Sequence, residues 1–330
     1  NLRKQQLIKK QYWDINTDPS RIETGPNKLE NLHRGKILDL LMDAVGKRLI
    51  SDVPLGAYLS GGIDSSAIVG CMAKIAQEQG NDPGNIKTFS VGFARGEKVN
   101  ELTQAKQMSE LMGTEHHEFM INPNVIEILP KLAWHFDEPF ADPAAVPVYE
   151  LSRNAKKHVT VVLTGDGGDE IFGGYDQYKF LLKRKQWQWL PSMVRGGIIG
   201  NMIKATPLSV LDNFYKYSSD TGNQLKERFA KFISTNSDAK AYDEVVSIFD
   251  ADERKELFGS TITKYKQKDA LYFPGKHLGK KQPPIHQFMY YDAKHLLPEG
   301  YLMKTDRTTM AWGIEARVPL LDHRIVQYSF

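Results

Sequence analysis

Hydrophobic residues occur along this chain either in short continuous runs or in stripes with helical spacing. The clearest continuous run covers residues 53–59, and it predicts a buried parallel strand. From Ala67 to Ile75 apolar residues recur at spacings of one, three and four, which predicts a helix. Only a short turn rich in glycine and serine separates the two. The pattern therefore predicts a strand, a tight turn and a helix in direct succession.

The alternation of strand and helix patterns continues through the first half of the chain. The predicted strands after the first cover residues 86–93, 115–121 and 158–164. The predicted helices cover residues 32–50, 100–112, 125–136 with an interruption at Pro130, 146–157 and 286–297. Strands joined by helices predict a parallel sheet, and right-handed crossovers give the strand order 3-2-1-4. We therefore predict an α/β fold: a Rossmann-like parallel sheet with helices on both faces and a helical C-terminal part.

The turn after the first strand, residues 60–66, reads Ser-Gly-Gly-Ile-Asp-Ser-Ser. Backbone N–H groups at a helix N-terminus attract anions, and glycines let a phosphate approach the backbone closely. A carboxylate such as Asp64 repels a phosphate unless a cation lies between them, and Mg²⁺ is the usual cation. The alternative is an ordinary Ser/Gly turn in which Asp64 caps the helix. The order and context of these residues favour the phosphate site.

A second glycine-rich loop follows the fourth predicted strand. Residues 165–170 read Gly-Asp-Gly-Gly-Asp-Glu, and Gly173-Gly174-Tyr175 comes shortly after. Ligands of open α/β sheets bind beyond the carboxyl ends of the strands where the strand order reverses, here between strands one and four. Both glycine loops follow these strand ends. Asp64 and Asp169 are therefore predicted to face one another across a bound nucleotide.

Composition narrows the class of protein. A length of 330 residues allows about two domains, and 41% hydrophobic with 25% charged residues is typical of a soluble globular protein. A formal charge of +3 gives no argument for nucleic acid or a membrane surface, and no apolar run is long enough to cross a membrane. The single cysteine, Cys71, lies on the apolar stripe of the helix after the first glycine loop and is predicted to be core. A reducing, cytoplasmic setting fits this cysteine usage.

Two regions outside the predicted sheet are less specific. Residues 1–31 contain Asp-Pro and Gly-Pro breaks and are predicted to be a linker from an upstream part. Residues 181–282 are helical and basic, and their aromatic residues include Trp187, Trp189, Phe214, Tyr215, Tyr217, Phe229 and Phe232. Aromatics among lysines can bind nucleic acid. Helical spacing at Phe229 and Phe232 favours core packing of a helical insertion instead.

Two charged or polar pairs have structural interpretations. His116 and His117 suggest a metal site, but adjacent residues of a strand point to opposite faces, which disfavours it. Glu315 and Arg317 stand in an otherwise apolar run. They are predicted to form a buried pair that fixes the C-terminal segment to the sheet.

Three segments together carry a family resemblance. They are residues 60–66, residues 164–170 with Gly173-Gly174-Tyr175, and residues 311–322, which read Ala-Trp-Gly-Ile-Glu-Ala-Arg-Val-Pro-Leu-Leu-Asp. From about His33 to Phe330 the chain resembles the synthetase domain of glutamine-hydrolysing asparagine synthetases. The resemblance implies a fold of the adenine nucleotide α-hydrolase, or ATP pyrophosphatase, type. It also implies a reaction in which the side-chain carboxylate of aspartate attacks the α-phosphorus of ATP, pyrophosphate leaves, and ammonia displaces AMP.

The same resemblance implies roles for residues at matching positions. The expected ATP and pyrophosphate contacts are Leu59, Ser60, Gly61, Gly62, Asp64, Ser65, Ser66, Val91, Thr164 and Gly165. Among them, Leu59 and Val91 would flank adenine, and Thr164 and Gly165 would contact adenine or ribose. The expected Mg²⁺ ligands are Asp64 and Asp169, together with pyrophosphate oxygens. Asp166 would assist the ammonia step.

The sequence also departs from the family pattern. Asp166 stands where Glu is frequent. A lysine expected near the phosphates aligns with Arg307, and Lys304 lies one helical turn away, so both are catalytic candidates. An Arg that one branch carries within residues 142–145 is absent. Another carboxylate substrate therefore stays open, as in the related β-lactam synthetases or peptide cyclases.

The family's glutaminase domain begins with a cysteine nucleophile, whereas residue 1 here is Asn. The chain is therefore expected to be the synthetase part, residues 32–330, with ammonia from an absent glutaminase domain or from solution. It also ends earlier than the family pattern. The alternative outside enzymes is a catalytically silent module that binds nucleotide or a partner, and a homodimer is left open.

Overall fold

The computed structural model describes residues 9–15, 28–93, 101–206, 222–259 and 284–330. These residues form two compact units. Unit 1 combines Asn1–Phe172 with Ala293–Phe330, and unit 2 is Gly173–Asp292. Most of the predicted linker at residues 1–31, and the aromatic residues Phe214, Tyr215 and Tyr217, lie outside the described residues. No helix in the described part of the chain is long and apolar enough to span a bilayer.

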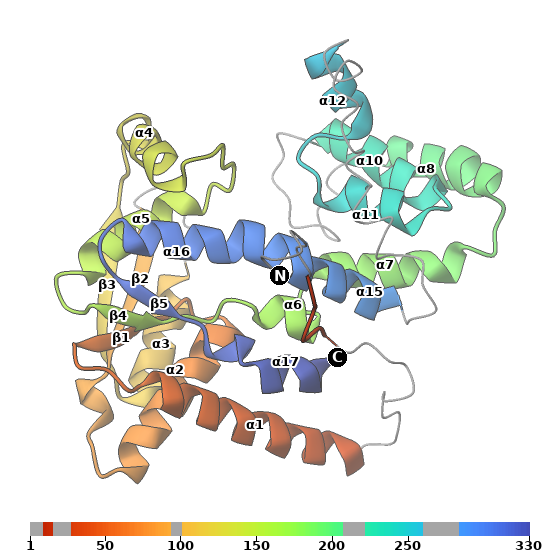
Figure 1. Ribbon diagram of the computed structural model, residues 1–330. Coiled ribbons are helices and arrows are strands. Elements are labelled where there is room, and N and C mark those ends of the chain that lie inside the picture. Colours follow the sequence, from red (N-terminus) through yellow and green to blue (C-terminus); the bar gives the residue numbers. More distant parts are fainter. Residues whose placement is uncertain (1–8, 16–27, 94–100, 207–221, 260–283) are drawn as a thin grey trace, which may run out of the picture. The chain divides into compact units, whose positions relative to one another are not determined.

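Unit 1 is built around a parallel sheet with the order β3-β2-β1-β4-β5 (Figure 1). Its strands are β1 (Leu55–Tyr58), β2 (Lys87–Phe93), β3 (Glu115–Ile121), β4 (Val161–Leu163) and β5 (Glu315–Arg317). The α/β class and the predicted order of the first four strands are confirmed. The fifth strand was not predicted, because it is only three residues long and two of them are charged.

Helices cover both faces of this sheet. They are α1 (Lys28–Arg48), α2 (Ile63–Glu78), η3 (Pro83–Asn85), α3 (Leu102–Met112), α4 (Val125–Phe136), α5 (Ala145–Ala155), α6 (Gly168–Phe172), η7 (Asp292–Leu302), α16 (Met303–Met310), η8 (Pro319–Leu321) and α17 (His323–Ser329). Helices α2 and α3 pack on one face, with α1 against α2, and helices α5 and α16 cover the other (Figure 1). Cys71 is 4% exposed on α2, as predicted, and burial raises the pKa of its thiol to about 11.

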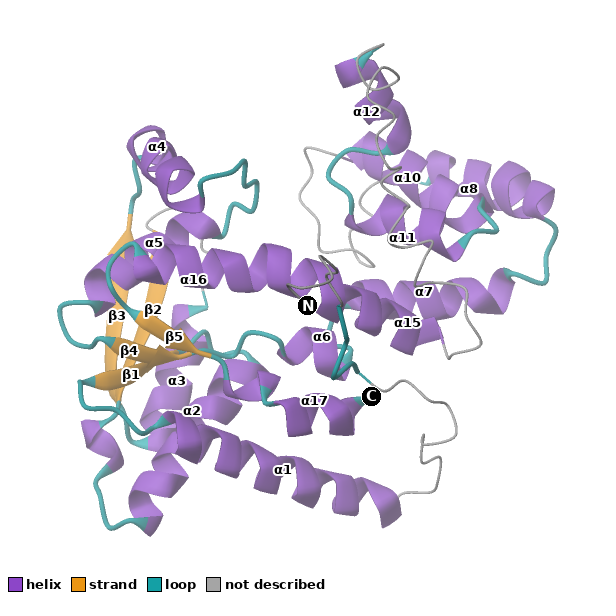
Figure 2. Cartoon of the chain, in the orientation of Figure 1, coloured by secondary structure: helices purple, strands orange, loops and turns teal. Residues whose placement is uncertain are grey.

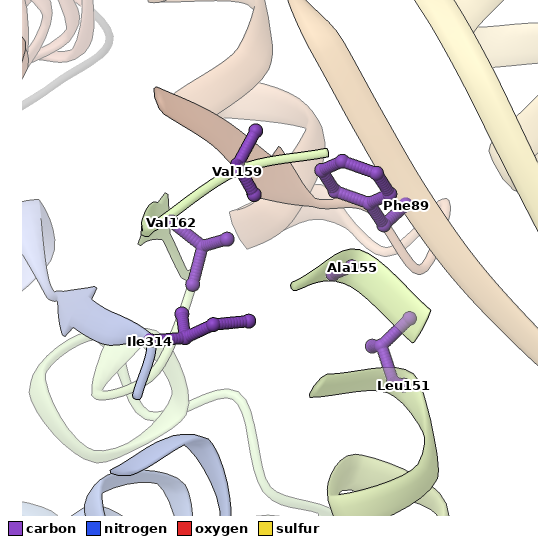
Figure 3. Close-up of a cluster of buried hydrophobic side chains, with 6 residues drawn as sticks. All are labelled: Phe89, Leu151, Ala155, Val159, Val162 and Ile314. Atoms are coloured by element: carbon purple, nitrogen blue, oxygen red, sulfur yellow. The ribbon is translucent and has the colours of Figure 1, made fainter. Parts of the chain in front are cut away.

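The core between the sheet and α5 is shown in Figure 3. Its buried side chains are Phe89, Leu151, Ala155, Val159, Val162 and Ile314. Ile314 and Ala316 both pack here, so the alternate residues of β5, Glu315 and Arg317, point to the opposite side of the sheet. His116 and His117, for which a metal site was disfavoured, make separate contacts: His116 hydrogen-bonds Thr88, whereas the His117 ring stacks on Phe89.

The predicted interruption of the fourth helix at Pro130 is wrong, since α4 is continuous through this residue. Proline removes the backbone hydrogen bond that would reach the carbonyl of Ile126, four residues earlier. Ile126 is 83% exposed, so its carbonyl is accessible to water in place of the lost partner. The buried face of α4, formed by Ile128, Leu132 and Phe136, is unaffected by the proline and holds the helix on unit 1.

The Glu315–Arg317 pair forms, with 2.7 Å between Oε1 and Nε, but it is not buried, because Glu315 is exposed. The guanidinium of Arg317 instead donates to the carbonyls of Arg48 and Ile50, both at 2.7 Å. These carbonyls lie at and just beyond the end of α1, where helical acceptors lack partners. Arg317 therefore ties β5 to α1.

Asp322 makes a second connection between the C-terminal segment and α1. Its carboxylate accepts from Arg48 at 3.3 Å and from Arg324 at 2.9 and 3.0 Å, and it caps α17 by accepting the Arg324 backbone N–H. The hydrogen bonds from Arg324 hold the pKa of Asp322 well below its usual range, against the effect of burial. The segment 315–322 thus acts as a brace between the edge of the sheet and α1.

Unit 2 contains only helices in its described residues (Figure 2). They are α7 (Asp176–Trp187), η5 (Val194–Ile199), α8 (Gly200–Ala205), α10 (Gly222–Ser234), α11 (Asp238–Val246), α12 (Ala251–Phe258) and α15 (Pro284–Tyr291). Phe232 is 2% exposed, as the core interpretation predicted, whereas Trp187 and Trp189 are exposed. Buried Arg184 donates to the Phe232 carbonyl at 3.0 Å, so polar contacts also organise this unit.

We expect Asp322→Asn to destabilise unit 1 by about 2 kcal/mol at pH 7, because partly buried charge pairs are lost, whereas the Asn side chain can still cap α17. The folded-state pKa of Asp322 is depressed, so its contribution is present above the unfolded pKa of about 4 and disappears as pH falls below it. Urea titration followed by hydrogen exchange of α1 and β5 measures the difference. Asp39→Asn, an exposed change on α1, is the matched control, and equal stabilities of the two variants at pH 7 would contradict the brace.

Candidate active site

The first glycine loop leaves β1 in a shape that its own side chains hold. The hydroxyls of Ser60 and Ser65 lie 2.9 Å apart, and the Gly62 N–H donates to the Ser60 hydroxyl at 3.2 Å. Gly61 has φ +78°, a backbone conformation that favours glycine. A Cβ at Gly61 would also lie 2.7 Å from the backbone N of Ala105 on α3. The loop is therefore both turned and packed in a way that requires glycine at this position.

The loop ends at the N-terminus of α2, which carries the features of an anion site. Gly62 is the N-cap residue and supplies no side-chain acceptor to the first turn. The hydroxyl of Ser66, one turn into the helix, is buried and has no hydrogen-bond partner within the described residues. Such a group is costly unless a ligand or water satisfies it. The residues present thus fit a bound phosphate group.

The second glycine loop packs directly against the first. A Cβ at Gly165 would lie 2.7 Å from the backbone N of Ser65. A Cβ at Gly168 would lie 2.6 Å from a carboxylate oxygen of Asp64. A side chain at Gly165 would require the backbone of the first loop to move, and one at Gly168 would displace the Asp64 carboxylate. Two loops a hundred residues apart in sequence therefore meet at the carboxyl ends of β1 and β4, which are neighbours in the sheet.

Asp64 and Asp169 meet at this junction. Burial, and then repulsion from Asp169, raises the pKa of Asp64 to about 6, and burial raises the pKa of Asp169. Within the described residues, no lysine, arginine or histidine pairs with either carboxylate. Across the same residues, no three His, Cys, Asp or Glu side chains gather to form a complete metal cage. The pair fits Mg²⁺, which binds through one or two carboxylates and takes its other ligands from phosphate and water.

Asp166 is held by two threonines. Its Oδ2 accepts from the hydroxyl of Thr164 at 2.7 Å and from that of Thr305 at 3.0 Å. Thr164 follows β4 directly, and Thr305 lies on α16, so Asp166 is fixed from two elements. Thr305 was missed by sequence reasoning, because only the fold brings α16 beside the second glycine loop.

Lys304 and Arg307 occupy different environments on α16. Lys304 pairs with Asp142 at 2.8 Å, and its Nζ lies 5.0 Å from the centre of the Tyr301 ring. The other oxygen of Asp142 accepts the Ala144 N–H at 2.9 Å, just before α5 begins. Arg307 is exposed and has no polar partner in the described part of the chain. Sequence reasoning also missed Asp142 as the partner of Lys304.

The two residues expected to flank adenine lie on neighbouring strands. Val91 is half-buried on β2 and packs against the core cluster of Figure 3. Leu59 is 2% exposed, its backbone N–H donates to the Phe89 carbonyl at 2.9 Å, and its carbonyl accepts from the Ser90 hydroxyl. Neither its side chain nor its backbone groups are therefore open to a base in this structure. The roles of these residues in binding adenine remain predictions.

The chain is similar to known proteins over nearly its whole length. The chain matches the family described as asparagine synthase over residues 36–330. It is 34% identical over 316 residues to asparagine synthetase 1 (glutamine-hydrolyzing) of Bacillus subtilis, covering 95% of this chain and 45% of that protein. It is 26% identical over 337 residues to amidase chyE of Penicillium rubens, covering 97% of this chain and 48% of the relative. The chain thus spans about half the length of the curated relatives it matches.

We expect Asp169→Asn to lower the pKa of Asp64, because the neighbouring charge is removed. A carboxyl whose folded-state pKa is raised stabilises the fold below its unfolded pKa of about 4, and that stability is lost as pH rises towards about 6. The thermal midpoint of the metal-free protein should therefore fall between these pH values, and fall less in Asp169→Asn. Asp52→Asn, an exposed change, is the control. Identical pH profiles for the wild type and Asp169→Asn would contradict the coupling.

Proposed function

The chain belongs to the asparagine synthase family, and on that premise we propose that it is the synthetase part of an ATP-dependent amide ligase that makes asparagine from aspartate and ammonia. The observation that carries this proposal is the close packing of the two glycine loops around Asp64. The loops bring phosphate donors, paired carboxylates and Asp166 together at the point where strand order reverses. That combination suits attack on the α-phosphorus of ATP better than it suits simple nucleotide storage.

In the proposed reaction, the side-chain carboxylate of aspartate attacks the α-phosphorus and pyrophosphate leaves. Ammonia then attacks the acyl carbon, AMP leaves with the bonding electron pair, and the amide forms after loss of a proton. Phosphoryl-type transfer depends mainly on positioning and charge neutralisation. The first-turn amides of α2 and the hydroxyls of Ser60, Ser65 and Ser66 would hold the pyrophosphate. Their fixed positions remove the need to reorganise donors during the reaction.

Asp64 and Asp169 would hold Mg²⁺, which supplies neutralisation of phosphate charge when bound. Their raised pKa values reflect two carboxylates without a cationic partner, an arrangement that binding of a cation would relieve. Asp166 would orient ammonia and take its proton, since Thr164 and Thr305 occupy only one of its oxygens.

Arg307 is favoured over Lys304 as the group that serves the phosphates. The charge of Lys304 is already compensated by Asp142, and its side chain is 12% exposed. Arg307 is exposed and has no polar partner among the described residues, so its charge is available. A guanidinium also binds phosphate oxygens in a bidentate manner.

The proposal extends to components outside this chain. Ammonia would come from a glutaminase domain that precedes residue 1, with residues 1–31 as the linker, and the enzyme would act in the cytoplasm. A second candidate is a related enzyme that adenylates another carboxylate, as β-lactam synthetases or peptide cyclases do. The absence of Arg from residues 142–145 and the similarity to an amidase-named relative support that candidate. A panel of carboxylic acids separates the two.

The product test supplies Mg·ATP, ammonium and aspartate labelled with ¹⁸O in its side-chain carboxylate. We expect pyrophosphate, asparagine and AMP that carries one ¹⁸O atom, because the attacking oxygen remains on phosphorus. Mass spectrometry of AMP measures the transfer. ADP and inorganic phosphate as products would rule out this chemistry, and labelled AMP with a different acid alone would favour the second candidate.

Variants test the assigned residues. Asp64→Asn should reduce turnover by at least about a hundredfold, since electrostatic stabilisation of phosphate charge is lost. Arg307→Gln should lower kcat more than Lys304→Gln does, for the same reason. Steady-state pyrophosphate release measures both, with Arg34→Gln on α1 as the control. A larger effect of Lys304→Gln on kcat would reverse the assignment of the phosphate-binding cation.

A further inference from the structure

A cavity of about 420 Å³ lies in unit 1 away from the glycine loops. Edge strand β3, helices α4 and α5, and Trp312 form its walls. Strand β2 separates β3 from β1, whereas the candidate active site lies at β1 and β4. The volume falls within the range of small-molecule sites, about 300–1,000 Å³. The cavity therefore has room for a ligand and does not coincide with the candidate active site.

Charged groups of both signs line this cavity. The ionisable residue Glu150 is buried, with 4% of its surface exposed. Its only ion-pair partner in the described residues is Arg153, at 2.7 Å. Lys131 approaches from α4 and has no acidic partner within the described chain. Buried charges are rare in proteins unless they are paired or used. The site thus presents two cationic groups from different helices beside a nearly buried carboxylate.

The remaining wall is aromatic. Tyr149 is buried and its ring lies 5.1 Å from that of Trp312. The indole N–H of Trp312 is also buried and finds no acceptor among the described residues. An unsatisfied donor of this kind is costly, and a ligand oxygen in the adjoining cavity would satisfy it after a small rotation of the ring. The wall therefore combines apolar surface with a donor that lacks an acceptor.

These properties restrict the class of ligand. A polyphosphate would face the carboxylates of Glu118, Glu127 and Glu150, which disfavours it. An apolar ligand would leave the charged groups desolvated and unpaired. A molecule with one carboxylate and one ammonium group can pair with both signs at once. The lining thus suits a small zwitterion.

We propose that this cavity is a binding site for a free α-amino acid, separate from the site where ATP and the acid substrate would react. The ligand carboxylate lies between Arg153 and Lys131, and the ammonium group faces Glu150. The ligand side chain packs on the Tyr149 and Trp312 rings. The proposal does not depend on the reaction catalysed, because every group it uses lies outside the glycine loops.

Isothermal titration of the purified protein with each proteinogenic L-amino acid, in the presence of saturating Mg·ATP, tests this. We expect at least one amino acid to bind with a Kd of about 1 mM or lower. Arg153→Gln and Lys131→Gln should each weaken that binding by about tenfold or more, because charge-assisted hydrogen bonds are lost. Lys131 is exposed, so its variant is expected to fold even if a variant that leaves the nearly buried Glu150 without Arg153 does not.

Arg34→Gln is the matched control, since it breaks a comparable ion pair within a helix, Arg34–Glu30 at 3.1 Å, away from the cavity. It should leave the binding unchanged.

Absence of binding by every amino acid would overturn the proposal. So would binding that survives Lys131→Gln and Arg153→Gln but disappears in Asp166→Asn, because that result would assign the ligand to the candidate active site. Product analysis with labelled aspartate is unaffected by either outcome, so the two proposals fail independently.

Discussion

The central constraint in unit 1 is that two like-charged carboxylates, Asp64 and Asp169, lie close together and partly out of water. Each is destabilised by burial, and Asp64 also by its neighbour, as the raised pKa values of both groups reflect. The backbone maintains this arrangement because Gly165 and Gly168 allow the loops to touch. A carboxylate pair of this kind is suited to a cation, whose binding would relieve the repulsion between the two groups.

The sheet order makes this junction possible. Strands β1 and β4 are 106 residues apart at their starts, Leu55 and Val161, yet they pair directly in the sheet. β5 then pairs with β4 and brings α16 over the same end, where Thr305 fixes Asp166. The charged residues of β5 do not serve the site directly; Arg317 secures the strand to the end of α1. The C-terminal motif is therefore a structural support for the region where the two glycine loops meet.

The two cationic residues of α16, Lys304 and Arg307, differ in whether an acidic side chain pairs with them. Lys304 is paired with Asp142 and covers Tyr301, so it stabilises the packing of α16 against the Asp142 loop. Arg307, one turn further, has no polar partner within the described residues. Similar spacing in sequence thus gives one structural cation and one available cation. The difference depends on which side of the helix meets the loop that carries Asp142.

The sequence by itself determined the α/β class, the order of the first four strands and the position of both glycine loops, because periodicity, crossover handedness and glycine turns are local properties. It did not determine β5, the continuity of α4 through Pro130, or the exposure of Glu315 in its pair with Arg317. β5 depends on the free edge of β4, and Arg317 depends on the end of α1, both distant in sequence. The continuity of α4 depends on which side of this helix the fold leaves exposed. The hydrogen bond from Thr305 to Asp166 and the Lys304–Asp142 pair likewise came only from tertiary structure, because side chains more than a hundred residues apart show no spacing pattern in the sequence that predicts their contact.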